Sequence, residues 1–316
     1  MTTTGLQHAF LLDGKGGART LDWAAIDAWT PDAGTLWINL DYSVPDADRW
    51  LVAHLDPIVR DALLDVDPRP RAIARGDELM LIVRGLNLNE GAAPEDMLSV
   101  RAWIGPNRVV TMRRRPSTSI KMIAADLRAG HGPRDTGELV ASLLERIVEH
   151  VVTRVDTLGD VVASCEERVL SETPADLRAT IADQRRRAIA LRRFLAPQRE
   201  ALGKLGGIQL SWVGTDTRAR FAETADRLMR TLEELDAARD RAAVTQEELQ
   251  SRIGEVTNQR LYVLSVLTAV FLPLNFVCEL LQTPFDPERP GFWLLTGCFA
   301  IAAIAQLWFF KKRGWI

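Results

Sequence analysis

The pattern of hydrophobic and polar positions changes twice along the chain, and its first part is built from short segments. Up to about residue 115, apolar and β-branched residues stand in brief runs bounded by Gly, Pro, Asn or Asp, which is typical of β-strands. The expected strands are 8–12, 35–40, 79–86, 98–104 and 108–112. Residues 46–64 have a helical pattern instead. Residues 1–115 are therefore predicted to form a compact α/β domain.

From about residue 117 the pattern becomes almost wholly helical. Asp135 and Glu138 have the spacing of a capping box, so a long helix is expected to start there and to run to about Ser171. Pro174 suits the first position of a second helix that should run towards Leu205. These two helices open a segment, 116–260, that is predicted to form a helical stalk.

A third helix should start near Asp216 and continue without a break. Residues 215–272 contain no Pro and only one Gly, Gly254. Alternating steps of four and three residues from Phe221 to Arg260 meet nine apolar residues at twelve positions, a coiled-coil period. A single helix of roughly 65 residues is expected, which at 1.5 Å per residue measures on the order of 95 Å.

The third part of the chain holds two long apolar runs, 261–281 and 292–310, joined by residues 282–291 and followed by a tail, 311–316. Each run has about the ~20 residues that a helix needs to cross a bilayer. The expected fold class is an α+β membrane protein with a cytoplasmic α/β domain, a long helical stalk and two C-terminal transmembrane helices. A pair of buried core helices is the alternative.

Charges around the two runs predict their orientation. Arg252 and Arg260 precede the first run and basic residues at 311–313 follow the second, whereas Asp286 and Glu288 lie in the connecting loop. The positive-inside rule then places both termini in the cytoplasm and the loop outside, for a multi-pass protein of the inner membrane. The N-terminus has no basic segment followed by an apolar core, so no signal peptide is expected.

Composition narrows the classes of function. The chain has 316 residues and a formal net charge of −3, so no basic excess points to nucleic acid. Two of the three cysteines, Cys278 and Cys298, lie in the apolar runs, and the four histidines lack metal-ligand spacing. Phosphate-loop, dinucleotide and hydrolase motifs are missing from the sequence. We therefore expect neither an enzyme nor a permanently bound cofactor.

Two arginine clusters, 185–187 and 192–193, lie on the second expected helix. Arginines beside an acidic stalk are typically solvated and paired with its carboxylates. A binding site for a lipid headgroup or another anion is the alternative, and the sequence leaves both open.

One face of the first apolar run is polar. Steps of three and four residues give the polar stripe, six of whose eight members are polar: Asn258, Leu261, Ser265, Thr268, Leu272, Asn275, Glu279 and Gln282. Polar groups in a span usually face a bundle interior or a water-filled path. One stripe cannot enclose a pore, but several copies around an axis can, which predicts a ring oligomer. Contact between helices without conduction is the alternative.

The chain resembles a known family. The segment Phe271-Leu-Pro-Leu-Asn-Phe276 and the two-part architecture look like the CorA superfamily of divalent metal ion transporters, closest to the zinc-transporter branch ZntB. The head carries the other resembling segments: Arg69-Pro-Arg71, Val83-Arg-Gly-Leu-Asn-Leu-Asn89, Pro94-Glu-Asp-Met97, Arg113-Arg-Arg-Pro116 and Leu191-Arg-Arg-Phe-Leu-Ala-Pro-Gln-Arg-Glu200.

The resemblance implies a homopentameric funnel in a lipid bilayer, with the first span lining the pore and Zn²⁺ or Mg²⁺ as the transported ion. Its implied partners are copies of itself and divalent metal ions. The implied lining residues are members of the polar stripe: Asn258, Leu261, Ser265, Thr268, Leu272 and Asn275.

The chain departs from the family at the outer end of this span. The usual Gly-x-Asn motif aligns with Gln282-Thr283-Pro284, and the Gly three residues earlier is replaced by Glu279. Two hypotheses follow. The chain is a divalent-cation transporter with an altered mouth, or it is a non-conducting scaffold or regulatory protein of the same fold.

Glu279 is the candidate that could replace the lost motif. Together with Asn275 it is expected to contact a hydrated metal ion, and Asp286 and Glu288 in the outer loop would add negative potential there. An ion pair between Glu279 and Arg289 is the structural alternative.

Overall fold

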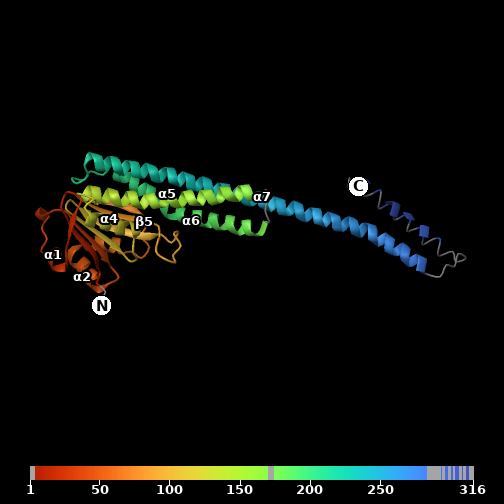
Figure 1. The fold of residues 1–316 in the computed structure, drawn as a ribbon, viewed down its shortest axis with the longest axis horizontal. Coiled ribbons are helices and arrows are strands. Elements are labelled where there is room, and N and C mark those ends of the chain that lie inside the picture. Colours follow the sequence, from red (N-terminus) through yellow and green to blue (C-terminus); the bar gives the residue numbers. More distant parts are fainter. Residues whose placement is uncertain are drawn as a thin grey trace. The chain divides into compact units, whose positions relative to one another are not determined.

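The computed structural model describes residues 4–169 and 174–282 and, beyond these, isolated positions between 293 and 312. It divides into two compact units, Met1–Glu248 and Leu249–Ile316, which are described one at a time. Figure 1 shows the sheet with the helices α4, α5 and α6 of the first unit beside it.

The first unit contains one seven-stranded sheet in the order β2-β1-β3-β7-β6-β5-β4. Its strands are β1 (Leu6–Leu12), β2 (Ala18–Thr20), β3 (Leu36–Asp41), β4 (Arg71–Arg75), β5 (Glu78–Gly85), β6 (Leu98–Gly105) and β7 (Arg108–Arg113). Only β3 and β7 run parallel, and every other neighbouring pair is antiparallel. All five expected strands are confirmed, within two residues at each end.

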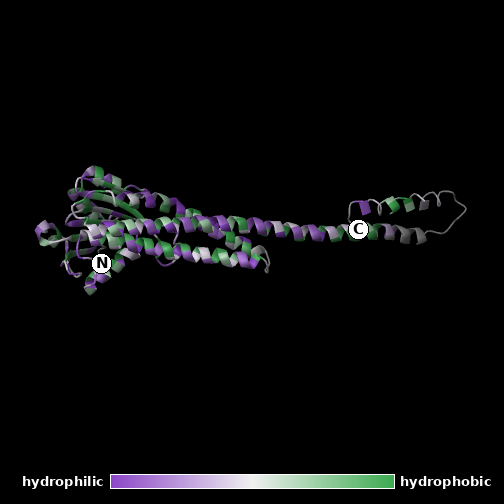
Figure 2. Ribbon diagram, turned by 90° about the horizontal axis from the view of Figure 1, so that it is seen from above, coloured by the Kyte–Doolittle hydropathy of each residue, from purple (hydrophilic) through white to green (hydrophobic). Residues whose placement is uncertain are grey.

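One face of the sheet carries the short helices α1 (Trp23–Asp27), α2 (Pro45–His54) and α3 (Pro57–Leu63), and a 3-10 turn, η1 (Pro31–Ala33), precedes β3. Their apolar residues form one core with the strands. This core includes Trp50, Leu51 and Leu63 from the helices and Ile38 and Ile82 from the sheet. In Figure 2 the strands are mostly hydrophobic, as expected for a sheet covered on both faces.

The opposite face packs against α5 (Thr136–Val169) and α6 (Pro174–Leu205), and α4 (Thr118–Ala129) packs against α5. The buried side chain of Gln198 on α6 accepts a 2.6 Å hydrogen bond from the backbone N–H of Arg84 in β5. The result is a three-layer α/β/α head. The expected domain boundary at residues 115 and 116 stays a prediction.

Three parts of the head differ from the sequence-based expectation. The prediction of one continuous helix over residues 46–64 is wrong, because the structure has two helices there: α2 ends at His54 and α3 begins at Pro57. Asp56 causes the restart, since its side chain accepts a hydrogen bond from the N–H of Ile58 and caps α3. The strands β2 and β4 and the helix α1 were not expected at all.

The caps and lengths of the long helices agree closely with the sequence. Oδ1 of Asp135 accepts from the N–H of Glu138 at 2.8 Å, which confirms Asp135 as the N-cap of α5. Glu138 accepts from the N–H of Arg134, one residue earlier than in an ideal capping box. The third helix, α7 (Thr215–Gln282), has 68 residues and no break.

The starts of α5 and α7 lie very close together. A Cβ atom added to Gly137 would lie 2.9 Å from the carbonyl oxygen of Trp212 and 2.8 Å from Oγ1 of Thr217. Only a glycine allows this approach. Further along, Arg220 on α7 is bound to Glu145 on α5 at 2.6 Å, and Arg192 on α6 to Asp236 on α7, also at 2.6 Å.

The turn between β4 and β5 is attached to the segment that leads into α7. Oδ1 of Asp77 accepts a hydrogen bond from the N–H of Ser211 at 2.7 Å, and its other carboxylate oxygen accepts from the Ser211 hydroxyl. Nε1 of Trp212 donates to the Asp77 carbonyl at 3.1 Å. We call these contacts the Asp77 clamp.

The second unit begins within α7, at Leu249. The first expected span, 261–281, falls on the last part of this helix, whereas most of the second, 292–310, falls outside the described residues. Among the residues that the structure describes, no helix is both long and apolar enough to cross a membrane.

Candidate functional site

The polar stripe lies on one side of α7 and is open to its surroundings. From Asn258 to Asn275 it contains six side chains, and all six are exposed in the single chain. The exposed fraction is 54% for Leu261 and 69% for Leu272. With 3.6 residues per turn, these six positions occupy an arc of about 100°. The structure therefore brings together the residues that the sequence grouped.

Two hydroxyl groups on the stripe are oriented by the helix itself. The Ser265 hydroxyl donates to the carbonyl oxygen of Leu261 at 2.8 Å, and the Thr268 hydroxyl donates to that of Leu264 at 2.8 Å. Because each proton is used within the helix, the oxygen lone pairs are left for a group outside it. Such oxygens can accept from the water shell of a hydrated cation.

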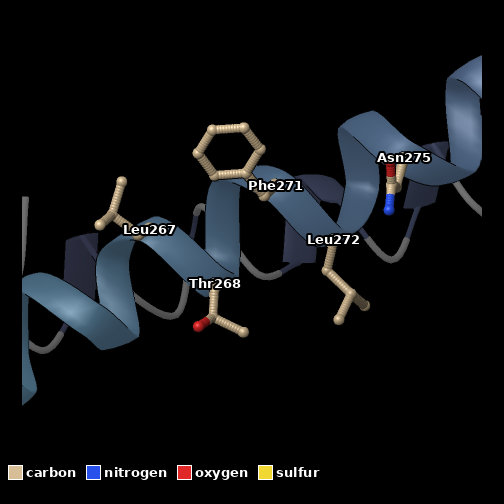
Figure 3. Close-up of a pocket in the computed structure, with 5 residues that line it drawn as sticks. All are labelled: Leu267, Thr268, Phe271, Leu272 and Asn275. Carbon is tan, nitrogen blue, oxygen red and sulfur yellow. The ribbon is translucent and has the colours of Figure 1, made fainter.

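A shallow pocket of about 310 Å³ lies on this part of α7 (Figure 3). It is lined by Thr268, Leu272 and Asn275 from the stripe, together with Leu267 and Phe271. Figure 3 shows Thr268 and Leu272 on one side of the helix and Leu267 and Phe271 on the other. The periodicity that defines the polar stripe does not include Leu267 and Phe271, although their spacing of four residues places both on one helix face.

Pro273 lies inside α7, between Leu272 and Asn275. A proline has no backbone N–H, so the carbonyl four residues earlier loses its helical donor. Proline is also a common point of bending in helices. The polar stripe therefore spans a position at which one backbone hydrogen bond of the helix is missing.

The outer end of the stripe is described only in part. Glu279 and Gln282 lie in the last turns of α7, but the described side chains of this helix end at Asn275. Thr283, Pro284, Asp286 and Glu288 lie outside the described residues, as does Arg289. The roles expected for these residues stay predictions.

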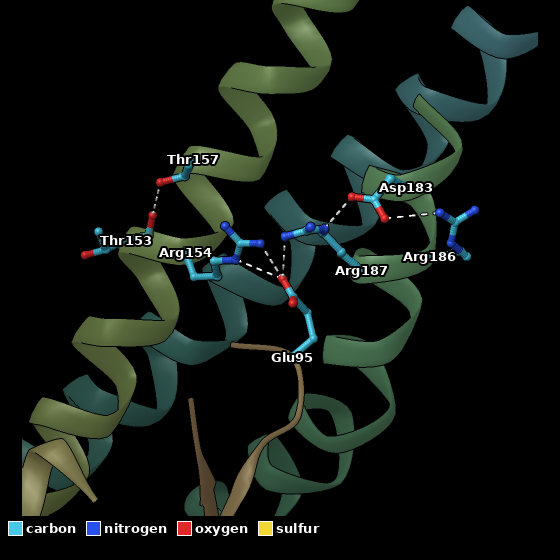
Figure 4. A network of polar contacts seen from close by, with 7 residues as sticks. All are labelled: Glu95, Thr153, Arg154, Thr157, Asp183, Arg186 and Arg187. Atoms are coloured by element: carbon cyan, nitrogen blue, oxygen red, sulfur yellow. Dashed lines mark hydrogen bonds and ion pairs between the residues drawn. The ribbon is translucent and has the colours of Figure 1, made fainter. Parts of the chain in front are cut away.

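A second polar cluster connects the loop between β5 and β6 to α5 and α6 (Figure 4). Oε1 of Glu95 accepts from both Nε (3.0 Å) and Nη2 of Arg154 on α5 and lies 3.6 Å from Nη1 of Arg187 on α6. Nε of Arg187 also donates to Asp183 at 2.6 Å. Glu95 is almost fully buried, with 8% of its side chain exposed.

The arginine clusters on α6 are mostly paired. Arg186 and Arg187 both contact Asp183, and Arg192 contacts the stalk residue Asp236. Arg193 lies 3.7 Å from Asp67. The pairing that we expected with acids of the stalk is confirmed for Arg192, whereas Arg187 is paired within α6 and with the loop residue Glu95.

No group of three or more His, Cys, Asp or Glu side chains in the described part of the chain is arranged to hold a metal ion. The polar groups on the described part of the stripe are hydroxyls and amides. These groups suit transient contact with a hydrated ion rather than permanent ligation.

The fold and this site define a two-part class of protein. A three-layer head ends in a helix that continues, without a break, into an apolar helix with one polar stripe. A model of the CorA-like Mg²⁺ transporter protein family matches residues 32–312. The chain belongs to this family.

Curated relatives cover almost the whole chain. The divalent cation transporter CmaX of Pseudomonas aeruginosa is 36% identical over an alignment of 330 positions, which covers 99% of this chain and 97% of the relative. The zinc transport protein ZntB of Yersinia pseudotuberculosis is 30% identical over 316 residues, covering 98% and 95%. The expected similarity to the ZntB branch is thereby confirmed.

Solved structures agree with the fold. The structure of full-length CmaX superposes with a TM-score of 0.88 at 35% identity and covers 98% of this chain and 97% of that protein. The CorA magnesium transporter of Methanocaldococcus jannaschii gives a TM-score of 0.74 at 17% identity over the full length of both chains. The similarity to the Methanocaldococcus jannaschii transporter concerns the fold alone.

Proposed function

We propose that this chain is one subunit of a homopentameric pore that moves divalent cations, Zn²⁺ or Mg²⁺, across the inner membrane. The observation that carries the proposal is the polar stripe on α7. Its hydroxyl oxygens and the amide of Asn275 face outward from a stretch of α7, residues 261–275, whose other side chains are mainly apolar. Two relatives of similar length are named as a divalent cation transporter and a zinc transport protein.

Exposed apolar surface supports a membrane location for the end of α7. Eight large hydrophobic side chains between residues 261 and 272 are each 44–69% exposed in the single chain. A patch of this kind needs to be covered by lipid or by other helices. In the proposed pore, lipid covers the apolar sides, copies of α7 cover the flanks of the stripe, and the runs 261–281 and 292–310 are the two spans, with both termini in the cytoplasm.

The stripe favours a hydrated ion. Mg²⁺ gives up its water slowly and prefers oxygen ligands, whereas Zn²⁺ prefers nitrogen and sulfur. The described stripe offers oxygen and amide groups only. A pore that passes the ion with its water shell accepts both metals, so the outer mouth, with Glu279, is the place where selectivity would arise.

One observation favours a second candidate function. Gln282-Thr283-Pro284 stands where the family pattern has Gly-x-Asn. A chain that has lost this ion-recognition motif could be a non-conducting scaffold or regulatory protein with the same fold.

Flux into liposomes tests the proposal. The purified chain is reconstituted and the uptake of Zn²⁺, Mg²⁺, Co²⁺ and Ni²⁺ is followed with an internal indicator, with empty liposomes as the control. Uptake of at least one ion, together with a pentameric mass in detergent, supports the proposed pore. A pentamer without flux favours the scaffold, and a stable monomer excludes a pore of this design.

A further inference from the structure

A pocket lined by arginines lies in the head, at the end of the sheet face covered by α2 and α3. Arg101 in β6 pairs with Ile82 and Met112, both members of the core on that face, so its side chain is on the same face. The pocket has a volume of about 260 Å³. Its polar lining consists of Arg84, Arg101, Arg114, Arg115, Tyr42 and Ser99, and no described acidic residue lines it. We call it the arginine pocket.

Arg101 is a buried cation without a carboxylate partner. It is 2% exposed. Its Nε donates to the Ser99 hydroxyl at 3.2 Å, its Nη1 donates to the Leu63 carbonyl at 2.5 Å, and its guanidinium lies 4.8 Å from the centre of the Tyr42 ring. In the described part of the chain, no carboxylate lies within ion-pair distance of it. Burying an unpaired charge is costly.

The pKa of Arg101 reflects this environment. Burial lowers the pKa of its guanidinium, and the neighbouring charge of Arg84 acts in the same direction, while Tyr42 and Asp65 act in the opposite one. An anion in the pocket would relieve the destabilising effects of both burial and the like charge.

Arg84 is the second buried cation of the pocket, 7% exposed. Its Nη2 contacts Asp67 at 2.5 Å, but that carboxylate is 62% exposed and also lies 3.7 Å from Arg193. The Nε of Arg84 is buried and has no hydrogen-bond partner. A buried donor left without a partner at a pocket wall indicates a missing acceptor.

Arg114 and Arg115 approach the pocket from the segment that follows β7. Both are exposed, and neither has an ion pair in the described part of the chain. Four arginines thus line the pocket, and Asp67 is the only described carboxylate within ion-pair distance of any of them.

A second pocket adjoins the first and enlarges the space. It has a volume of about 450 Å³ and shares Met97 and Arg115 with the arginine pocket. It adds Arg193 and the ring of Phe194. Two carboxylates, those of Glu95 and Asp96, also line it. Glu95 is already bound to Arg154 and Arg187, and Asp96 is exposed to solvent.

We propose that the arginine pocket is a binding site for a phosphate group, free or carried by a small metabolite such as a nucleotide. Guanidinium groups bind phosphate oxygens through pairs of parallel hydrogen bonds. A phosphate offers up to two charges and several acceptor oxygens to four converging arginines, whereas chloride offers one charge and a carboxylate two oxygens. The adjoining pocket, with Phe194, has room for the organic part of a metabolite.

Calorimetric titration of the full chain in detergent tests the site. Inorganic phosphate and ATP are titrated separately at constant ionic strength, with sodium chloride as the reference. The double variant Arg114→Gln/Arg115→Gln removes two exposed pocket arginines without touching the core. The matched control is Arg19→Gln/Arg49→Gln, which removes two exposed arginines elsewhere on the head.

Phosphate or ATP should bind the natural chain and the control equally. The pocket variant should bind about tenfold or more weakly, the loss expected when hydrogen bonds to a charged group are removed. Stronger binding of ATP would identify a nucleotide as the carrier, and stronger binding of phosphate would identify the free ion. Heats no different from those of chloride, or equal affinity in the two double variants, would overturn the proposal.

Discussion

Glu95 holds Arg154 through a single oxygen atom. Oε1 of Glu95, in the loop between β5 and β6, accepts hydrogen bonds from Nε at 3.0 Å and from Nη2 of Arg154 (Figure 4). The two side chains are 8% and 18% exposed, so the ion pair is largely shielded from water. It joins the loop of the sheet domain to the middle of α5.

Removing the charge of Glu95 should therefore destabilise the head. Glu95→Gln leaves Arg154 without its carboxylate partner, whereas Arg187 keeps Asp183. Breaking a buried pair in this way costs about 3–5 kcal/mol. Because Arg187 is partly exposed, we expect about 2–3 kcal/mol, measured by urea unfolding of the chain in detergent. Glu90→Gln, at an exposed position of the same loop, is the control, and an equal effect of both substitutions would contradict the role of the pair.

Two glycines of α5 should respond oppositely to alanine. The Cβ atom of Gly137→Ala would lie 2.9 Å from the backbone of Trp212, so we expect a loss of about 1–3 kcal/mol. At Gly159 the nearest atom is 3.9 Å away, so Gly159→Ala should stabilise the helix by about 0.5–1 kcal/mol. Thermal unfolding of both variants checks this, and a neutral Gly137→Ala would mean that the starts of α5 and α7 are not held together.

The leucines of the polar stripe should act as a hydrophobic gate if the chain conducts. Rings of leucine can close a pore by excluding water, so Leu272→Ala and Leu261→Ala should increase the leak of divalent cations into liposomes. Val263→Ala is the control, since Val263 is also exposed but lies about 180° around the helix from Leu272 and outside the pocket. Unchanged leak in the single variants and in the Leu261/Leu272 double variant would exclude this gate.

Glu279 should determine how strongly the mouth attracts cations. In a five-fold ring, up to five carboxylates would surround the axis, so Glu279→Gln should weaken the apparent affinity for the transported ion while the oligomer stays intact. Flux at a series of ion concentrations measures this. If the residue instead forms an ion pair with Arg289, both Glu279→Gln and Arg289→Gln should lower the stability of the oligomer. An unaltered flux and an unaltered oligomer would rule out both roles.

The stability of the head should decline between pH 6.5 and about pH 4 because of His8. Burial and the cations Arg128, Arg113 and Lys121 lower the pKa of His8 from 6.5 to about 4. Above pH 6.5 the imidazole is neutral in both states and has no effect. As the pH falls through this window the unfolded chain binds the proton first, so stability is lost.

The expected effect of His8 is about 1 kcal/mol, because the side chain is only half-buried and solvent weakens the repulsion. His8→Gln should flatten the dependence of the unfolding midpoint on pH in this window. His131→Gln, at an exposed position, should leave the slope as it is. The same slope in the His8 variant and the natural chain would refute the assignment.

Features of the fold that depend on local sequence could be predicted, and α7 is the clearest example. Its start near Asp216 and its continuity as far as Leu272 follow from one long stretch without proline, and the structure continues the helix through Pro273 to Gln282. The cap at Asp135 needs only the residues next to it. The break between α2 and α3 also had a local signal, Asp56 followed by Pro57, which the continuing helical periodicity concealed.

Features that depend on distant partners could not be predicted. β4 has the sequence Arg-Ala-Ile-Ala-Arg, with one β-branched residue, and it is a strand because a turn at Gly76, with φ of +62°, lays it against β5. The arginine pocket was missed for a similar reason. A single arginine in each of two apolar strands, at Arg84 and Arg101, is a visible signal, but the sequence does not show that strand pairing brings the two to one face.

The polar stripe and its pocket could be predicted only in part. Helical periodicity places Ser265, Thr268 and Asn275 on one face, and one helix carries all three, but their role in lining a pore stays a prediction. Leu267 and Phe271 join the same pocket from the neighbouring face, and a stripe drawn along one line could not include them.

The two sides of the Asp77 clamp are synthesised at different times. All seven strands of the sheet are encoded before residue 114, so the ribosome completes them before it adds Ser211 or any part of α7. Since the N-terminal part of a growing chain folds first, the turn that carries Asp77 can be in place when its partners emerge. The exposed apolar end of α7 is translated later still, attached to a helix whose beginning already has a folded surface to bind.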